Sequence, residues 1–380
     1  MRSSSRSDVD PFIVMDVMEA ARKAEADGRR IIHMEVGQPG TPAPQAARAA
    51  LAKALDGSTL GYTVALGMPE LRQRIAKLYR DWYELDLNPD RIIITTGASG
   101  GFILAFTAMF EAGQKVALGS PSYPSYRQIL KALSLEAVNL PTVPENRFQP
   151  EPFELPGDVD GLILASPSNP TGTMLDRAAL SGLVDRVEQA GISLISDEIY
   201  HGLHYENRAI SALEVTDDVA VINSFSKYFS MTGWRIGWLV VPEAQIRTYE
   251  RLAQNMFICA PHASQLTALH ALDCQDECAA NLAVYAANRQ KMIEGLPKAG
   301  METFAPPDGA FYIYANVSHL TNDSRAFAAE ILDQAGVAVT PGWDFDPHRG
   351  GGYIRFCYSG TTSDVEEGLE KLQGFIAARS

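Results

Sequence analysis

Residues 224–238 read Ser-Phe-Ser-Lys-Tyr-Phe-Ser-Met-Thr-Gly-Trp-Arg-Ile-Gly-Trp, so that one lysine, Lys227, stands among hydroxyls and Arg235 follows eight residues later. Hydroxyls, a guanidinium and backbone amides freed by glycine are the groups that bind a phosphate dianion. A lysine beside that phosphate suits an imine with an aldehyde, because a partly desolvated amine loses its proton more readily. A solvated surface charge is the commoner explanation of any single lysine. The whole stretch nevertheless predicts a pyridoxal phosphate (PLP) site.

Short apolar runs on either side of this stretch predict a mostly parallel sheet. They lie at residues 91–96, 115–119, 161–165, 192–196 and 219–223, and helical patterns separate several of them. Runs without alternation are typical of strands buried on both faces, and intervening helices are typical of crossover connections. Residues 238–241 are expected to form one more strand, antiparallel because so little chain precedes it.

The remaining patterns predict helices around the sheet and a second, smaller α+β part. Helices are expected at residues 10–27, 46–55, 69–83, 97–110 and over much of 244–295, with a short strand at 31–36. Alternation of apolar and polar residues appears at 311–315 and 352–357. A chain of 380 residues is long for one core and suits two domains.

Composition narrows the classes of partner. The formal net charge of −14 argues against a nucleic-acid backbone or an anionic membrane as the main partner. No apolar run is long enough for a membrane span, and the N-terminus lacks the apolar core of a secretion signal, so a cytoplasmic protein is expected. The four cysteines are interpreted as reduced packing residues and not as metal ligands, because no histidine or second pair completes a site: Cys259, Cys274, Cys278 and Cys357.

Polar residues follow several of the predicted strands at their carboxyl ends, where open parallel sheets bind ligands. Ser99 lies in a Thr-Gly-Ala-Ser segment that opens a helix and could hold a phosphate, although for this segment alone an ordinary strand-to-helix turn is the better explanation. Asn169 follows the predicted strand at 161–165 in a proline-rich loop, which is more often only a turn. Asp197 and Tyr200 end a further strand. The carboxylate could cap a helix or pair with a cationic pyridine nitrogen.

Four segments together resemble the class I/II aminotransferases, which are PLP enzymes of the aspartate aminotransferase fold (PLP fold type I). They are Asn-Pro-Thr-Gly at 169–172, Asp-Glu-Ile-Tyr at 197–200, Ser-Phe-Ser-Lys at 224–227 and Gly-Trp-Arg-Ile-Gly at 233–237. Residues 62–72 and 352–356 look like two further blocks of that family. The resemblance implies a large domain (46–285) with a mostly parallel, seven-stranded-type sheet sandwiched by helices. It also implies a smaller α+β domain (286–380), which the N-terminal segment (1–45) joins.

The resemblance further implies how PLP is held. Lys227 would form the Schiff base and then act as the proton-transfer base, while Asp197 would pair with the pyridine nitrogen. Tyr200 and Asn169 would bond the ring hydroxyl oxygen, and Tyr123 would stack on the ring. The phosphate would be held by a set of small and basic residues: Gly97, Ala98, Ser99, Ser224 and Arg235. Tyr62 would reach the phosphate of a neighbouring subunit, which makes a homodimer part of the active site.

For the substrate, the resemblance implies a ping-pong transfer of the α-amino group from an amino acid to a 2-oxo acid. Arg355 would grip the α-carboxylate, and Gly37 and Asn169 would line the substrate pocket. No second arginine stands in a recognisable side-chain-binding position, so specificity for dicarboxylic substrates is unsupported. Tyr123 and Phe12 would suit an apolar or aromatic side chain.

Three other functions fit part of the pattern. A PLP-dependent carbon–sulfur β-lyase on the same fold uses the same lysine, aspartate and arginine. A non-catalytic ligand-binding module would need a DNA-binding segment, for which residues 1–36 are too short and carry no pattern. A purely structural α/β protein would leave the coincidence of motifs unexplained.

Overall fold

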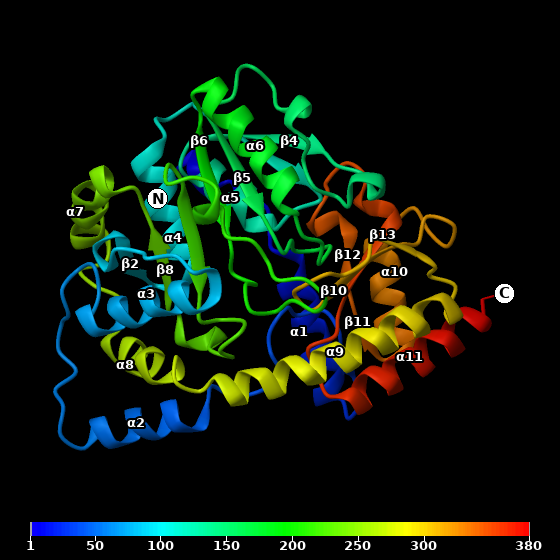
Figure 1. Ribbon diagram of the computed structural model, residues 1–380. Coiled ribbons are helices and arrows are strands. Elements are labelled where there is room, and N and C mark those ends of the chain that lie inside the picture. The colour runs from blue at the N-terminus through cyan, green and yellow to red at the C-terminus, as the bar shows by residue number, and fades with distance from the viewer. Residues whose placement is uncertain (1, 380) are drawn as a thin grey trace.

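A seven-stranded sheet forms the centre of the protein in the computed structural model, which describes residues 2–379 (Figure 1). The strand order is β2 (Ile92–Thr95), β8 (Gly237–Val240), β7 (Ala220–Ser224), β6 (Ser193–Asp197), β5 (Gly161–Ala165), β3 (Lys115–Ser120) and β4 (Glu136–Pro141). All neighbours are parallel except at β8, which runs antiparallel to both β2 and β7. The mostly parallel sheet and the antiparallel strand near residue 238 are therefore confirmed.

Helices bury both faces of this sheet. Along β2, Ile92 and Ile94 join the hydrophobic cluster on one face, whereas Ile93 joins the cluster on the other. This explains why the strands read as unbroken apolar runs in the sequence. The first face packs against α3 (Pro69–Tyr83), α6 (Arg177–Ala190) and α8 (His262–Ala271), and the second against α4 (Gly97–Met109), α5 (Pro124–Ala132) and α7 (Ile246–Met256).

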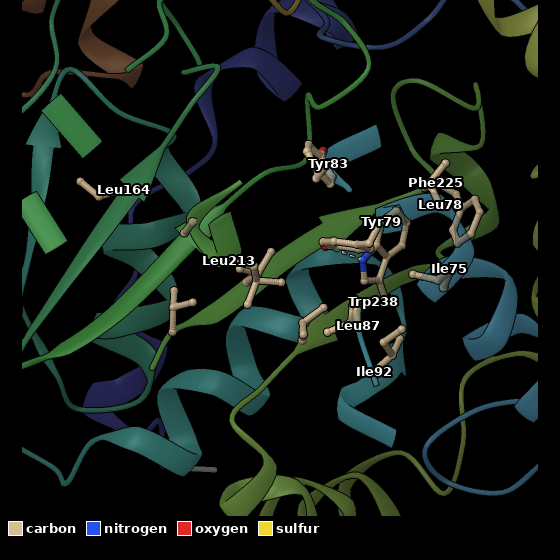
Figure 2. Close-up of a cluster of buried hydrophobic side chains, with 14 of the residues drawn as sticks. Ile75, Leu78, Tyr79, Tyr83, Leu87, Ile92, Leu164, Leu213, Phe225 and Trp238 are labelled. Carbon is tan, nitrogen blue, oxygen red and sulfur yellow. Dashed lines mark hydrogen bonds between the residues drawn. The ribbon is translucent and has the colours of Figure 1, made fainter. Parts of the chain in front are cut away.

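Figure 2 shows part of the first cluster, where α3 packs on the sheet. Tyr79 of α3 lies beside Trp238 of β8, whose indole Nε1 donates to the tyrosine hydroxyl at 3.2 Å. Phe225 also belongs to this cluster, and its ring centroid is 5.0 Å from that of Trp238. Because Phe225 and Trp238 stand near the two ends of the 224–238 stretch, their burial anchors the segment that carries Lys227 to the core.

The second, smaller part combines both ends of the chain, as the predicted fold class requires. Its antiparallel sheet has the order β12 (Thr340–Pro341), β13 (Tyr353–Cys357), β10 (Tyr312–Asn316) and β9 (Thr303–Phe304). Near the N-terminus, β1 (Ile32–His33) pairs in parallel with β11 (Val337–Ala338). The helices outside the large sheet's two layers are α1 (Ile13–Ala26), α2 (Gln45–Leu55), α9 (Gln275–Lys298), α10 (Ser324–Glu330) and α11 (Thr362–Ala377).

Helix α9 runs between the two parts and lies beside α11 along the lower edge of the molecule in Figure 1. Its Cys278 packs in a cluster of the large sheet, and its Met292 packs in the core of the smaller part. The domain bounds 1–45, 46–285 and 286–380 stay a prediction, since one continuous helix crosses the middle boundary.

Three details differ from the sequence-based expectation. The helical stretch expected at 244–295 is interrupted twice and forms the three helices α7, α8 and α9. Pro261 stands directly before α8, because proline is tolerated at the start of a helix and not in its interior. The strand expected at 31–36 shortens to Ile32–His33, which has only one short partner. The edge strand β4 was not predicted, because its partly exposed residues lack the apolar run of the central strands.

Within residues 2–379, no helix has the length and apolar character needed to cross a membrane.

Candidate active site

A cavity of about 240 Å³ lies beyond the carboxyl ends of β5, β6 and β7, between the two parts of the chain. The parallel strands end at the same edge of the sheet, which brings the loops that follow them together. Most of the residues predicted from the sequence line this cavity: Gly37, Ala98, Ser99, Tyr123, Asn169, Asp197, Tyr200, Lys227, Arg235 and Arg355. Gly97, Ser224 and Tyr62 are not among the lining residues.

Lys227 projects into the cavity from the loop after β7. Its Nζ donates to the backbone oxygen of Gly37 at 2.5 Å and lies 5.8 Å from the centre of the Tyr200 ring. Burial, as the largest cause, lowers the pKa of this amine to about 8. A lysine with such a pKa is neutral in about a tenth of the molecules at pH 7, far more than an ordinary lysine, and the neutral amine is what a nucleophile or a base requires.

Asp197 ends β6 and is only 5% exposed. The backbone N–H of Ile199 donates to Oδ1 at 3.1 Å, and the Tyr126 hydroxyl donates to Oδ2. Burial raises the pKa of this carboxyl to about 6, against the effect of both hydrogen bonds. Asp197 therefore gains from any cationic partner that enters the cavity.

Arg355 projects from β13 of the smaller part and is 2% exposed. Its Nη1 donates to Asn169 Oδ1 at 2.9 Å, and its Nη2 donates to Thr340 Oγ1 at 3.1 Å and to the backbone oxygen of Glu35. The guanidinium lies 4.5 Å from the centre of the Tyr312 ring. Its Nε has no partner, and no carboxylate among residues 2–379 pairs with it. A buried arginine without a carboxylate is suited to an anionic ligand.

The amino end of α4 forms the opposite end of the cavity. Its N-cap residue, Thr96, makes no side-chain hydrogen bond to the first turn, so the amides near Ala98 and Ser99 have no side-chain cap. Gly97 adopts a positive φ of 75°, and a Cβ at this position would collide with the guanidinium of Arg235. A helix amino end beneath a guanidinium is a combination that binds phosphate.

Two aromatic pairs shape the walls between these ends. The Tyr200 and Tyr312 hydroxyls are 2.7 Å apart, and both side chains are buried. Tyr123 meets Phe12 edge to face, with ring centroids 5.8 Å apart. The N-terminal segment thus contributes an apolar side to the cavity near Tyr123.

Ser224 and Tyr62 lie elsewhere. The Ser224 hydroxyl donates to the backbone oxygen of Ile236 at 2.9 Å and lies 2.8 Å from Ser226 Oγ, behind the cavity wall. Ser226 itself lines the cavity. Tyr62 is 82% exposed on this chain. Direct contacts of Ser224 and Tyr62 with a phosphate stay predictions.

Sequence reasoning missed several lining residues: Val14, Met15, Val36, Tyr126, Ser226, Thr232 and Tyr312. Ser226 could have been found, since it lies next to Lys227 in the decisive stretch. Tyr126 and Tyr312 carried no usable signal, because only the tertiary packing of α5 and β10 brings them to Asp197 and Tyr200.

Comparisons with known proteins decide the family. Residues 29–372 match the profile of the family described as aminotransferase class I and II. The chain belongs to this family. The valine–pyruvate aminotransferase of Mycobacterium tuberculosis is 43% identical to this aminotransferase, over 100% of this chain and 99% of its own.

Solved structures agree with the family and the fold. The crystal structure of an aminotransferase from Silicibacter pomeroyi covers 100% of both chains, with 64% sequence identity to this chain and a TM-score of 0.95. The aspartate aminotransferase from Thermus thermophilus is 28% identical over 99% of this chain and 100% of its own, with a TM-score of 0.91. The predicted aspartate aminotransferase fold is therefore confirmed, as is an enzyme that transfers amino groups between amino acids and 2-oxo acids.

This aminotransferase is PLP-dependent, as its family is, and the cavity fits that cofactor. One end offers the uncapped amides of α4 and the Arg235 guanidinium for a phosphate. The middle offers a buried amine, Lys227, and a buried carboxylate, Asp197, for an aldehyde and a ring nitrogen. Each polar part of PLP thus has a chemically matching group.

Proposed function

We propose that this aminotransferase moves the α-amino group of an apolar amino acid such as valine to a monocarboxylic 2-oxo acid such as pyruvate. The observation that carries the proposal is the set of cations on the cavity wall. Among the lining residues the cations are Lys227, Arg235 and Arg355, and each has one task in the proposed reaction. Among residues 2–379, no further cation lines the cavity to pair with a second carboxylate on the substrate.

The wall near Arg355 supports an apolar substrate side chain. Phe12, Val14, Met15 and Val36 line the cavity from the N-terminal segment. Burying an apolar side chain against such a wall is favourable, whereas a carboxylate there would lose its hydration without gaining a partner. The 43% identical relative is named for valine and pyruvate, which agrees with this chemistry.

The charged residues would divide the chemistry among them. When bound, PLP supplies an aldehyde for the amino group and a ring that draws electrons from the α-carbon. Asp197 would hold a proton at the ring nitrogen, and Arg355 would hold the substrate carboxylate with the N–H groups that have no acceptor in the protein. Lys227 would take the proton from the α-carbon with its neutral amine and pass it on to the cofactor side, not back to the α-carbon, so that the amine is neutral again when the half-reaction ends.

The remaining residues would orient the cofactor. Asn169 and Tyr200 would donate to the ring hydroxyl oxygen, and Asn169 also accepts from Arg355, which joins the two binding tasks. Arg235, Ala98 and Ser99 would hold the phosphate at the amino end of α4. Tyr123 would cover one face of the ring, since its side chain borders the cavity between the two ends.

A panel assay tests this function. Valine, alanine, phenylalanine and aspartate are offered as donors with pyruvate or 2-oxoglutarate as acceptor, and ammonia release is followed in parallel. We expect alanine to form from valine and pyruvate with little ammonia. A clear preference for aspartate with 2-oxoglutarate would contradict the proposed substrate class. A β-substituted amino acid such as β-chloroalanine is also offered without an acceptor, and release of ammonia and pyruvate from it would indicate the β-lyase reaction.

We further propose that the active enzyme is a cytoplasmic homodimer in which Tyr62 completes the neighbouring site. Tyr62 is 82% exposed, as is its near neighbour in the sequence Val64 at 59%, and burial of such apolar side chains against a second subunit would be favourable. Mixing Lys227→Ala and Tyr62→Ala subunits should restore part of the activity, because one site of each hybrid dimer keeps both residues. An active monomer in light scattering, or mixtures no more active than the sum of their parts, would contradict this arrangement.

A further inference from the structure

Tyr126 contacts Asp197 and has no role in the reaction proposed above. It lies on α5, its side chain is 2% exposed, and its hydroxyl donates to Oδ2 of Asp197. Burial raises the pKa of Tyr126 well above its ordinary value, so the hydroxyl keeps its proton and remains a donor. The residue is not part of any of the motifs that mark the family in this sequence.

The Tyr126 ring is held on two sides. Its centroid lies 5.0 Å from that of Phe102 on α4 and 5.3 Å from that of Tyr123, which it meets edge to face. These contacts leave the hydroxyl little freedom, because a ring packed between two others has few alternative rotamers. The position of the donor is therefore set by packing and not by Asp197 alone.

Few other groups act on Asp197. The Ile199 N–H satisfies Oδ1, and Lys227 is the cation whose charge favours the ionised carboxylate. Tyr123 and Tyr200 also face this region, and both stay protonated because burial raises their pKa values. Tyr126 is thus the side chain that donates to the Asp197 carboxylate among the described residues.

We propose that Tyr126 is a positioning residue that orients the Asp197 carboxylate and keeps it ionised for the ring nitrogen of PLP. This inference rests on the proposed role of Asp197. A buried carboxylate and a ring nitrogen compete for one proton, and a hydrogen bond donated to the carboxylate makes it the weaker base. Tyr126 therefore shifts that proton toward the ring, where it increases the electron-withdrawing power of the cofactor.

The test compares PLP affinity of apoproteins between about pH 5.5 and 8.5. Tyr126→Phe removes the hydroxyl and keeps the packing. Tyr249→Phe is the matched control, because Tyr249 is fully buried on α7 and its hydroxyl has no partner. Melting temperatures of the apoproteins check that both variants fold.

We expect Tyr126→Phe to bind PLP about tenfold more weakly than wild type at neutral pH, since it loses a hydrogen bond to a charged group. The loss should grow as the pH falls, because the carboxyl then protonates at a higher pH than in wild type. Tyr249→Phe should behave as wild type. In an Asp197→Asn background, Tyr126→Phe should cause no such pH-dependent loss.

Equal PLP affinity and pH dependence in wild type and Tyr126→Phe would overturn the inference. The same loss in the Asp197→Asn background would also overturn it, because the effect would not pass through the carboxylate. An Asp197→Asn single variant that binds PLP and turns over substrate as wild type does would instead refute the proposed role of Asp197, so the two failures are distinguishable.

Discussion

Replacing Arg355 with alanine should lower kcat/KM for every amino acid substrate by a similar factor. A guanidinium has five N–H donors, and three acceptors in the protein engage this one: Asn169 Oδ1, Thr340 Oγ1 and the Glu35 backbone oxygen. Two donors remain, among them Nε–H, which has no partner. Hydrogen bonds to charged groups are worth about 1.5–3 kcal/mol each, so losing two should reduce kcat/KM by about 10²- to 10⁴-fold.

The assay follows the first half-reaction, in which the amino acid converts the PLP form of the enzyme, by the change in cofactor absorbance. Valine, alanine and phenylalanine should lose similar factors, because the α-carboxylate is common to all three. Affinity for PLP should change little, since Arg355 is placed on the substrate. Arg355→Lys is the matched variant, which keeps the charge and loses the planar fork, and it should recover only part of the loss. Aspartate is included as an acidic substrate, and a loss confined to aspartate would contradict the placement of Arg355 on the α-carboxylate.

Two further predictions concern the buried charges. Because burial lowers the pKa of Lys227 to about 8, the rate at which the apoprotein binds PLP should rise as the pH passes through about 8. Stopped-flow absorbance measures this rate. A rate that does not depend on pH would count against Lys227 as the nucleophile. Asp197 has a pKa near 6 when folded and an ordinary value of 3.8, so ionising it costs the apoprotein about 3 kcal/mol above pH 6 and nothing below the ordinary value. Asp197→Asn should therefore raise the melting temperature of the apoprotein at high pH and leave it unchanged well below pH 3.8. Turnover of the variant reconstituted with PLP should nearly disappear. An unchanged melting temperature at high pH would contradict the free-energy cost of burying the Asp197 carboxylate.

The central sheet was predictable because a strand that is buried on both faces has an uninterrupted run of apolar residues in the sequence. Ile92, Ile93 and Ile94 alternate between two cores, so no polar residue interrupts the run. The edge strand β4 carries no such mark, since its Glu136 is exposed and its middle residues are only partly buried. The local sequence therefore predicts a strand when both of its faces are apolar, and it does not predict a partly exposed strand at the edge of the sheet.

The candidate site divides in a similar way. Residues that stand at strand ends within compact motifs, such as Asp197 and Lys227, were found because each motif has its own recognisable pattern. Tyr126 and Tyr312 reach the site from α5 and β10, and their contacts arise only when distant segments pack together. The sequence predicts only part of the N-terminal wall: Phe12 is expected there as an apolar contact, whereas Val14 and Met15 occupy ordinary positions of an amphipathic helix.

Locating the lysine that bonds the cofactor tests the proposed active site most directly. The PLP-loaded enzyme is reduced with borohydride and digested, and the modified peptide is identified by mass spectrometry. We expect a single cofactor adduct on Lys227, absent from Lys227→Ala. An adduct on another lysine of the wild-type enzyme, or one that persists in Lys227→Ala, would contradict the assignment of this site.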